Sequence, residues 1–351
     1  MVIIHNMKNC KAISLYYAIA ALGIFMALAA CTKQPANGSP TATAQVSPTP
    51  TATPAPLGSV ENPVVMGFVE SSTGSSNYPP EQVELAQAIT VNTGFTVSSR
   101  VYDNWEDLLE AMQDGEVHLA WMQPLTYLYA SEEGIAEIGL LSNHFGLYYY
   151  GVQYLANIES GFTVYYDAVG QQNTADAATA LAQFGGRRPC WIEPKSISGY
   201  VVPASLLAAN EVPTLDGAYV QTHTAAVRAL YIKGICDFAA TFAISGDPRT
   251  ASGVLDDLPD ALNRVVIIWR TDASIPSLGL AYSQSLPEEF RQAINLTLTD
   301  LVKTDTGKAI LAGANDGYDI QDLRVVDGSI YDTLRENVSA LSYDLENALG
   351  R

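Results

Sequence analysis

The sequence predicts an α/β protein of two lobes, each a mostly parallel sheet flanked by helices, joined by two hinge strands. After residue 62, apolar runs of strand length alternate with longer stretches of helical spacing, which is typical of parallel sheets. About 290 residues follow that point, more than a single hydrophobic core usually holds. A second alternating block lies within the first, so we expect 63–150 and 268–351 to form lobe 1 and 151–267 to form lobe 2.

Apolar runs bounded by turn residues define the expected strands. They lie at 63–69, 95–101, 117–122, two pieces within 138–156, 189–192, 219–220, 236–240 and 265–269. Stretches with apolar residues at helical spacing define the expected helices. These lie at 79–93, 105–112, 200–207, 224–232, 287–302 and 329–349.

The N-terminus has the pattern of an export signal followed by a tether. Two lysines precede an apolar run over 12–30, and Leu-Ala-Ala directly precedes Cys31, the parts of a signal peptide. A Cys in this position resembles the bacterial lipobox, so we expect 1–30 to be removed and Cys31 to be lipidated. Residues 31–62 are rich in Pro, Thr and Ala, which predicts a disordered tether. The apolar run is also long enough for an uncleaved transmembrane anchor. Either alternative places the rest of the chain outside the cytoplasm.

The composition argues against several classes of function. The chain has 18 Lys+Arg against 37 Asp+Glu and a formal net charge of −19, whereas nucleic-acid binding needs clustered cations. The same balance argues against a polybasic membrane-surface protein. The sequence contains no GxSxG elbow, Walker A loop, HExxH motif or GxGxxG after a strand. We therefore expect no enzyme activity, no catalytic residue, no metal and no cofactor.

Two cysteines remain beyond the lipidation site, Cys190 and Cys236, each on an expected strand of lobe 2. An exported pair of cysteines is usually oxidised. If the two strands are neighbours, a disulfide would close a loop of about 46 residues and stabilise the fold by about 3–4 kcal/mol. The alternatives are a metal site or a thiol nucleophile. Two thiols with no nearby pair of histidines have poor spacing for zinc, and we favour the structural disulfide.

Three polar segments follow expected strands and open helices. They are Glu70–Thr73, Gln123–Tyr127 and Ser196–Tyr200. Ligands of open α/β sheets bind at the carboxyl ends of strands, and a helix N-terminus offers unpaired N–H groups and a positive dipole end. For any one segment, a simple N-cap is the better explanation. The three together predict a cleft that binds a tetrahedral oxyanion.

The chain resembles the PhnD-like substrate-binding proteins of phosphate, phosphite and phosphonate ABC transporters, which have the type II periplasmic binding fold. The matching segments span about 64 to 335 and are similar to the family's motifs. They are GEVHLAWMQP at 115–124, PKSISGY at 194–200, GICDFA at 234–239 and WRTDASIP at 269–276, together with His223. The serine-containing segment, the histidine and the G-x-C-D segment are fairly specific in combination.

The resemblance implies that the ligand lies between the lobes. In lobe 2, Ser196 and Ser198 would bind oxyanion oxygens, together with backbone N–H groups from Gly199 towards Tyr200. His223 would donate one more hydrogen bond.

In lobe 1, the resemblance implies that Ser71, Ser72 and Thr73 supply the opposing hydroxyls. Gln123 would contact the ligand, and Tyr127 would line the wall of the cleft.

The chain departs from the family pattern at three places. His118 stands where the family usually has Asp, which we expect to affect packing rather than the ligand. Glu70 is a less expected acid near the first-lobe loop and would favour a protonated anion or an amine-bearing phosphonate. Residues 241–244 contain no carboxylate, so an amine-recognising role at that place is not expected.

The resemblance therefore implies a lipid-anchored, extracytoplasmic solute-binding protein. It would capture phosphate, phosphite or a phosphonate as a monomer and deliver it to an ABC permease and its ATPase. Two alternatives remain open at this point. The same fold could bind another solute, such as a sulfonate, a vitamin precursor or an aromatic anion, or the protein could be a surface sensor not coupled to transport.

Overall fold

The computed structural model describes residues 54–70 and 80–349. The predicted signal peptide, Cys31 and most of the predicted tether lie outside the described residues, as do the three candidate ligand residues at 71–73. None of the helices in the described part of the chain has the length and apolar character that a membrane span requires.

The first sheet has six strands of mixed direction. Their order is β14 (Asp322–Val325), β4 (Ala136–Asn143), β13 (Gly279–Ser283), β3 (Leu119–Met122), β1 (Val64–Val69) and β2 (Val97–Tyr102). Strand β1 is parallel to β2 and β3, whereas β13 runs antiparallel to β3 and β4. Strands β1 and β3 are buried along nearly their whole length, as expected for strands covered on both faces.

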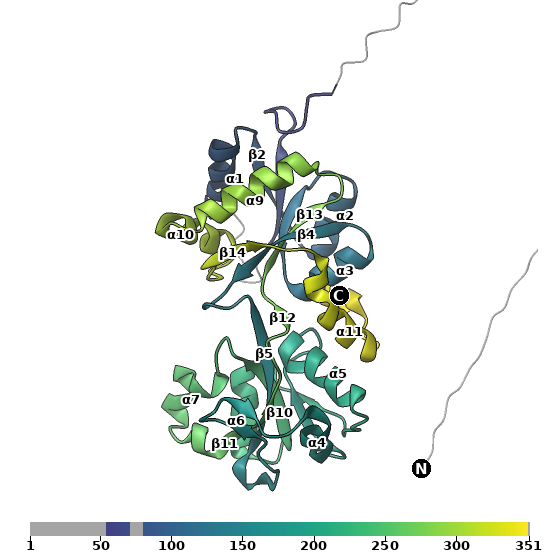
Figure 1. Ribbon diagram of the computed structural model, residues 1–351, viewed down its shortest axis with the longest axis vertical. Helices are drawn as coiled ribbons and strands as arrows, with labels where there is room; N and C mark the ends of the chain where they lie inside the picture. The colour runs from purple at the N-terminus through teal and green to yellow at the C-terminus, as the bar shows by residue number, and fades with distance from the viewer. Residues whose placement is uncertain (1–53, 71–79, 350–351) are drawn as a thin grey trace, which may run out of the picture. The chain divides into compact units, whose positions relative to one another are not determined.

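Helices cover both faces of the first sheet (Figure 1). They are α1 (Pro80–Thr93), α9 (Glu288–Leu301) and α10 (Asp305–Ala314) on one side, and α2 (Trp105–Gln113) and α3 (Pro124–Glu132) on the other. The apolar residues of α1, α9 and α10 form one core with the sheet, and those of α2 and α3 form another. The sheet is thus the middle of three layers.

The second sheet has a five-strand path. The order is β11 (Val265–Arg270), β5 (Tyr149–Asn157), β10 (Phe238–Ala243), β8 (Pro189–Trp191) and β9 (Ala218–Tyr219). Strands β10, β8 and β9 are parallel, and β5 is antiparallel to β10 and β11. A hairpin of β6 (Tyr166–Asp167) and β7 (Gln172–Asn173) lies apart from this path.

Five helices accompany the second sheet. They are α4 (Ala177–Leu181), α5 (Val202–Ala209), α6 (His223–Ile232), α7 (Ser252–Asp257) and α8 (Ala261–Arg264). On the side of α4 and α5, Phe184 stacks on Phe238 with 4.1 Å between ring centroids. On the other side, α6 to α8 form a separate core with Cys190 and Cys236.

Two chain segments connect the sheets, and they pair with each other. Strand β5 begins beside β12 (Ile275–Pro276), which pairs with Tyr149 and Tyr150 before the chain returns to β13. The fold is therefore the two-lobed arrangement predicted from the sequence, with two hinge strands. The predicted fold class is confirmed.

The C-terminal segment contacts both lobes. The sequence predicts one helix over 329–349, but α11 (Asp332–Ala340) ends before Ser342, whose φ is +49°, and a short 3₁₀ helix follows at Leu345–Leu349. Ser205 Oγ of α5 donates a hydrogen bond to Asn337 Oδ1 at 2.7 Å. Figure 1 shows α11 between α3 and α5.

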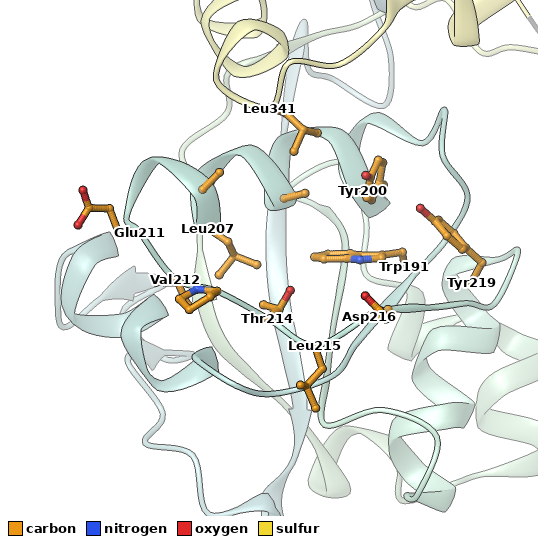
Figure 2. Close-up of a pocket in the computed structure, with 14 residues that line it drawn as sticks. Trp191, Tyr200, Leu207, Glu211, Val212, Thr214, Leu215, Asp216, Tyr219 and Leu341 are labelled. Carbon is orange, nitrogen blue, oxygen red and sulfur yellow. The ribbon is translucent and has the colours of Figure 1, made fainter.

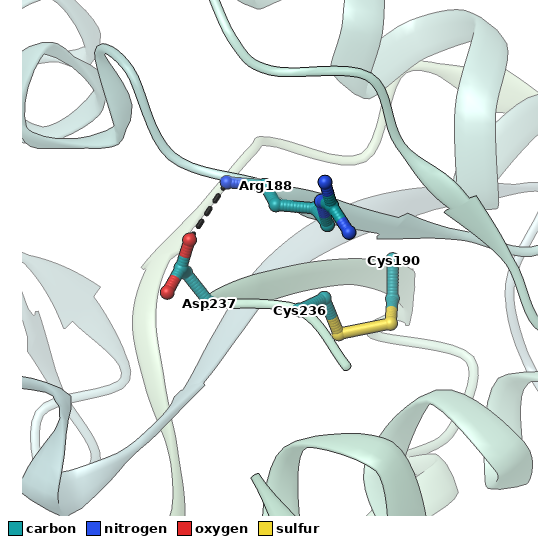
Figure 3. Close-up of a disulfide and its surroundings, with 4 residues drawn as sticks. All are labelled: Arg188, Cys190, Cys236 and Asp237. Carbon is teal, nitrogen blue, oxygen red and sulfur yellow. Dashed lines mark hydrogen bonds between the residues drawn. A yellow bond between two sulfur atoms is a disulfide. The ribbon is translucent and has the colours of Figure 1, made fainter. Parts of the chain in front are cut away.

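The predicted disulfide is confirmed. Cys190 and Cys236 are joined with 5.5 Å between their Cα atoms, and Cys190 lies in β8 beside β10 in the register of the sheet. Next to the disulfide, the Arg188 backbone N–H donates to Asp237 Oδ2 at 2.8 Å (Figure 3).

The folded unit begins earlier than the sequence predicts. Residues 54–62, assigned to the tether, form a turn in which Gly58 O accepts a hydrogen bond from Thr96 N at 2.7 Å. Leu57 packs on the core of the first lobe. The sequence did not predict this turn because its composition is that of the tether and only one large apolar residue, Leu57, packs on the core.

Candidate functional site

A cavity of about 380 Å³ is lined by residues of both lobes. Its wall includes Gln123 and Thr126 from the first lobe, and Lys195, Ser196, Ser198 and His223 from the second. We call it the anion cavity. It brings together four of the predicted ligand residues: Gln123, Ser196, Ser198 and His223.

The first-lobe wall contains the N-terminus of α3. Gln123 precedes the helix with extended backbone angles and makes no side-chain cap, and Pro124 occupies the first turn. The first backbone bond of the helix runs from Tyr127 N to Gln123 O at 3.0 Å. The N–H groups of Leu125 and Thr126 come before this bond, so they are the unpaired donors of a helix N-terminus. They can bind an anion.

The second-lobe wall contains a π-helical turn at Ile197–Val201. Ser196 Oγ accepts a hydrogen bond from Gly199 N at 3.1 Å, so the N-cap that the sequence left open as an alternative is present. The hydroxyl proton of Ser196 remains available to donate. Ser198 is 5% exposed, and its hydroxyl forms no hydrogen bond with a described residue.

Gly199 serves the packing of this turn. In this structure the Gly199 N–H donates to Ser196 Oγ, so ligand binding by Gly199 stays a prediction. An added Cβ would lie 2.1 Å from Ile192 Cγ1, and Gly199 O accepts a hydrogen bond from Ile192 N at 3.2 Å. Glycine therefore lets the turn approach the end of β8 closely.

His223 is the first residue of α6, directly after the N-cap Thr222. Its ring packs edge-on against Phe242 with 4.8 Å between centroids. Burial lowers the pKa of His223 to about 4, so the imidazole is neutral at pH 7. Its Nδ1 is buried and has no described partner. Because an unpaired N–H is rarer in protein interiors than an unpaired acceptor, the favoured tautomer carries its proton on Nε2, as a hydrogen-bond donor.

Lys195 and Thr126 are site residues that the sequence analysis did not single out. Lys195 is exposed beside Glu193 at the cavity and forms no ion pair with any other described residue. Thr126 is 3% exposed. Lys195 lies inside the PKSISGY segment that resembles the family motif. Its positive charge beside the two serines could have identified it as a candidate ligand residue.

Tyr127 does not line the anion cavity, so this prediction is corrected. It is 2% exposed, its hydroxyl accepts a hydrogen bond from Ile138 N at 3.3 Å, and its ring lies 4.4 Å from that of Tyr331. On α3, the side chain of Tyr127 belongs to the core, and Leu125 and Thr126 face the cavity instead.

Tyr200 lines a different cavity, of about 770 Å³, on the second lobe. Figure 2 shows it beside Trp191 and Tyr219, with ring centroids 5.6 Å from Trp191 and 5.9 Å from Tyr219. The predicted ligand contact concerns the backbone near Tyr200, not this side chain, and it stays a prediction. The Tyr200 backbone N–H is used by Ser196 O at 2.9 Å.

His118 has a structural role in the first sheet. It is 7% exposed, and its Nδ1 accepts a hydrogen bond from Val65 N at 3.0 Å. Burial lowers the pKa of His118, which keeps the ring neutral and Nδ1 free to accept. A carboxylate could accept the same hydrogen bond.

The fold is that of type II periplasmic binding proteins, as solved structures show. XAC2383 from Xanthomonas citri bound to chloride ion is 14% identical over 81% of this chain and 98% of that chain, with a TM-score of 0.59. The same protein bound to ATP is 13% identical over 82% of this chain and 98% of that chain, with a TM-score of 0.58. PhnD1 from Prochlorococcus marinus (MIT 9301) in complex with methylphosphonate is 13% identical over 80% of this chain and 98% of that chain, with a TM-score of 0.52. No curated protein matches the chain.

Residues 70–324 match the family described as "ABC transporter, phosphonate, periplasmic substrate-binding protein". The chain belongs to this family, and the predicted resemblance is confirmed. It is thus a periplasmic-type solute-binding protein of the ABC transporter class, a family that is extracytoplasmic and works with a permease and an ATPase.

Proposed function

We propose that the protein captures phosphate, phosphite or a phosphonate in the anion cavity and delivers it to an ABC permease. One observation carries this proposal. The first turns of α3 and α6 and the Ser196 turn meet at one cavity, with Lys195 beside them. Helix N-termini, hydroxyls and one ammonium group suit a tetrahedral oxyanion. Lobe 1 (63–150 and 268–351) and lobe 2 (151–267) would close on the ligand by bending at the two hinge strands.

Calorimetry tests the proposal on residues 32–351, which lack the signal and the lipidation site. The panel is phosphate, phosphite, methylphosphonate and, as a competing class, methanesulfonate. Micromolar or tighter binding of one phosphorus oxyanion supports the proposal. Binding of the sulfonate alone, or of nothing in the panel by folded protein, contradicts it.

Two substitutions locate the binding site. Ser198→Ala removes a hydroxyl donor and should lower the affinity by about 1.5–3 kcal/mol, the range for hydrogen bonds to charged groups. The matched control is Ser142→Ala, because Ser142 is also buried with an unpaired hydroxyl among the described residues but lies in β4 outside the cavity. Lys195→Gln should weaken binding most at low salt. Its control, Lys303→Gln on α9's C-terminal side, removes an exposed charge elsewhere.

We also propose that Cys31 is lipidated and tethers the protein to the membrane. Labelling with a radioactive fatty acid in the producing bacterium should mark the wild-type chain and the Cys10→Ser control. It should not mark Cys31→Ser. Label that survives in Cys31→Ser would contradict the anchor.

A further inference from the structure

A groove on the second lobe has no part in the proposed function. It is the cavity of about 770 Å³ that contains Tyr200, and none of the described residues that line it also lines the anion cavity. Helix α5 and the loop over 211–217 form two of its walls, and Leu341 of the C-terminal segment also lines it (Figure 2). We call it the lobe-2 groove.

Three aromatic rings lie along the lobe-2 groove. Trp191 ends β8, Tyr219 ends β9, and Tyr200 lies in the π-helical turn. The ring of Tyr200 is inclined by 73° to that of Trp191 and by 60° to that of Tyr219. Rings set edge-on to one another leave slots for flat apolar groups. Grooves lined by aromatic rings are the usual binding surface for proline-rich segments in the polyproline II conformation.

The lobe-2 groove is open to solvent along its rim. Leu215 is 51% exposed and Tyr219 is 50% exposed, although both side chains are large and apolar. Sites for small solutes usually enclose most of the surface of the ligand. Exposed apolar side chains beside a groove are more typical of a surface that binds another protein, so the occupant that fits best is a peptide segment.

The charges on the lobe-2 groove are negative. Figure 2 shows Glu211 at one end of the groove and Tyr219 at the other, with Trp191 between them and Asp216 below Trp191. Among the described residues that line the groove there is no lysine or arginine. Neither Glu211 nor Asp216 forms an ion pair within the described part of the chain. An arginine of a bound peptide would gain a carboxylate partner and an aromatic face.

We infer that the lobe-2 groove binds a basic, proline-rich segment of a partner protein. Prolines of the segment pack against the aromatic rings, and its arginines pair with Glu211 and Asp216. The chain's own tether is also rich in proline, but residues 34–62 contain no lysine or arginine. The tether therefore lacks the charge that complements the groove, and the partner is a separate protein.

Two peptides of equal shape test the role of charge. Residues 32–351 are titrated with the peptide RPLPPLPR, blocked at both ends, and with the same peptide carrying citrulline in place of both arginines. Citrulline keeps the shape of the arginine side chain without its charge. The basic peptide should bind about threefold to tenfold tighter, as expected for two exposed ion pairs. Equal affinity of the two peptides, or binding of neither, overturns the inference.

Two further peptides test the role of proline and the identity of the occupant. The peptide RALAALAR should bind about tenfold more weakly than RPLPPLPR, because prolines reduce the backbone freedom that binding must restrict. Equal affinity of these two overturns the inference. The peptide VSPTPTATPAP, which is residues 46–56 of the tether, should bind no tighter than the citrulline peptide. If it binds as tightly as RPLPPLPR, the tether is the occupant and the inference is overturned.

Exposed residues of the groove test the location of the peptide without disturbing the core. Glu211→Gln and Asp216→Asn should each weaken RPLPPLPR about twofold to fourfold and leave the citrulline peptide unchanged. Their matched control is Asp256→Asn, an exposed acid of α7 on the same lobe that does not line the groove. Leu215→Ala should weaken both peptides about threefold to tenfold. Its control is Leu262→Ala, which is 42% exposed on α8. Equal losses in the groove variants and their controls, or no loss in any, overturn the inference.

The outcomes separate the inference from the proposed function. The groove variants should bind the phosphorus oxyanion as tightly as the wild type does, because none of the substituted residues lines the anion cavity. If the oxyanion binds but RPLPPLPR does not, the inference fails and the proposed function stands. If RPLPPLPR binds at the groove but no oxyanion binds, the proposed function fails and the inference stands.

Discussion

Lowering the pH tests whether His223 is a neutral hydrogen-bond donor. Burial lowers its pKa from 6.5 to about 4, so the folded protein must be destabilised when the ring is protonated. The contribution of His223 to stability is fully present above pH 6.5. It is lost as the pH falls from 6.5 towards 4, because the unfolded chain binds the proton first.

The magnitude follows from the size of that shift. Between pH 7.5 and pH 4.5, a group with these two pKa values loses about 2.5 kcal/mol of stability. Because the ring is partly accessible at the cavity, solvent screening lowers this to about 1–2.5 kcal/mol. Burial also lowers the pKa of His118, which adds to the acid sensitivity of the fold, so the effect of His223 must be measured as a difference between two proteins.

Denaturant unfolding of the wild type and of His223→Gln gives that difference. The wild type should lose about 1–2.5 kcal/mol more than the variant between pH 7.5 and 4.5. An NMR titration of the ring should give a midpoint well below 6, and a bound oxyanion should raise it, because negative charge stabilises the imidazolium. A midpoint near 6.5 without ligand, or equal acid sensitivity of both proteins, would refute the reasoning.

Three further predictions concern the stability of the fold. Reducing the Cys190–Cys236 disulfide, which spans 46 residues, should lower the free energy of unfolding, measured in guanidinium, by about 4 kcal/mol. Equal unfolding midpoints of the oxidised and reduced proteins would contradict this. Gly199→Ala would place a Cβ too close to Ile192 and should lower the free energy of unfolding by about 1–3 kcal/mol. An unchanged melting temperature would contradict the steric argument. Tyr331→Phe removes a hydroxyl with no described partner and should change stability by less than about 1 kcal/mol, whereas a larger loss would reveal a partner.

The sequence predicted the elements whose apolar pattern is strong. Strands such as β1 and β3 are continuous apolar runs because the sheet is covered on both faces. Strand β14 was not predicted because it lies at the edge of the sheet and buries only Leu323. Helix α10 was missed because it contains Gly307 and Gly313, which have low helix propensity. Gly307 is needed there, since a Cβ would lie 1.8 Å from Leu301 O.

The residue types of the candidate site could be predicted, but not the direction of every side chain. Strand–loop–helix order placed Gln123 at the carboxyl edge of the first sheet and Ser196 and Ser198 at that of the second, and the structure brings them together at one cavity. Tyr127 was misplaced because the sequence of α3 is apolar on several sides, so its pattern does not say which side meets the core.

The binding motion of this protein must accommodate more than its two hinge strands. The C-terminal segment leaves β14 on the first sheet, packs α11 against α5 on the second, and ends with Leu349 in the wall of the anion cavity. This segment is a further connection between the two lobes, beside the two hinge strands. Packed helices move relative to one another by small sliding shifts. A change in the angle between the lobes would therefore have to shift the contact of α11 with α5 as well as the two hinge strands.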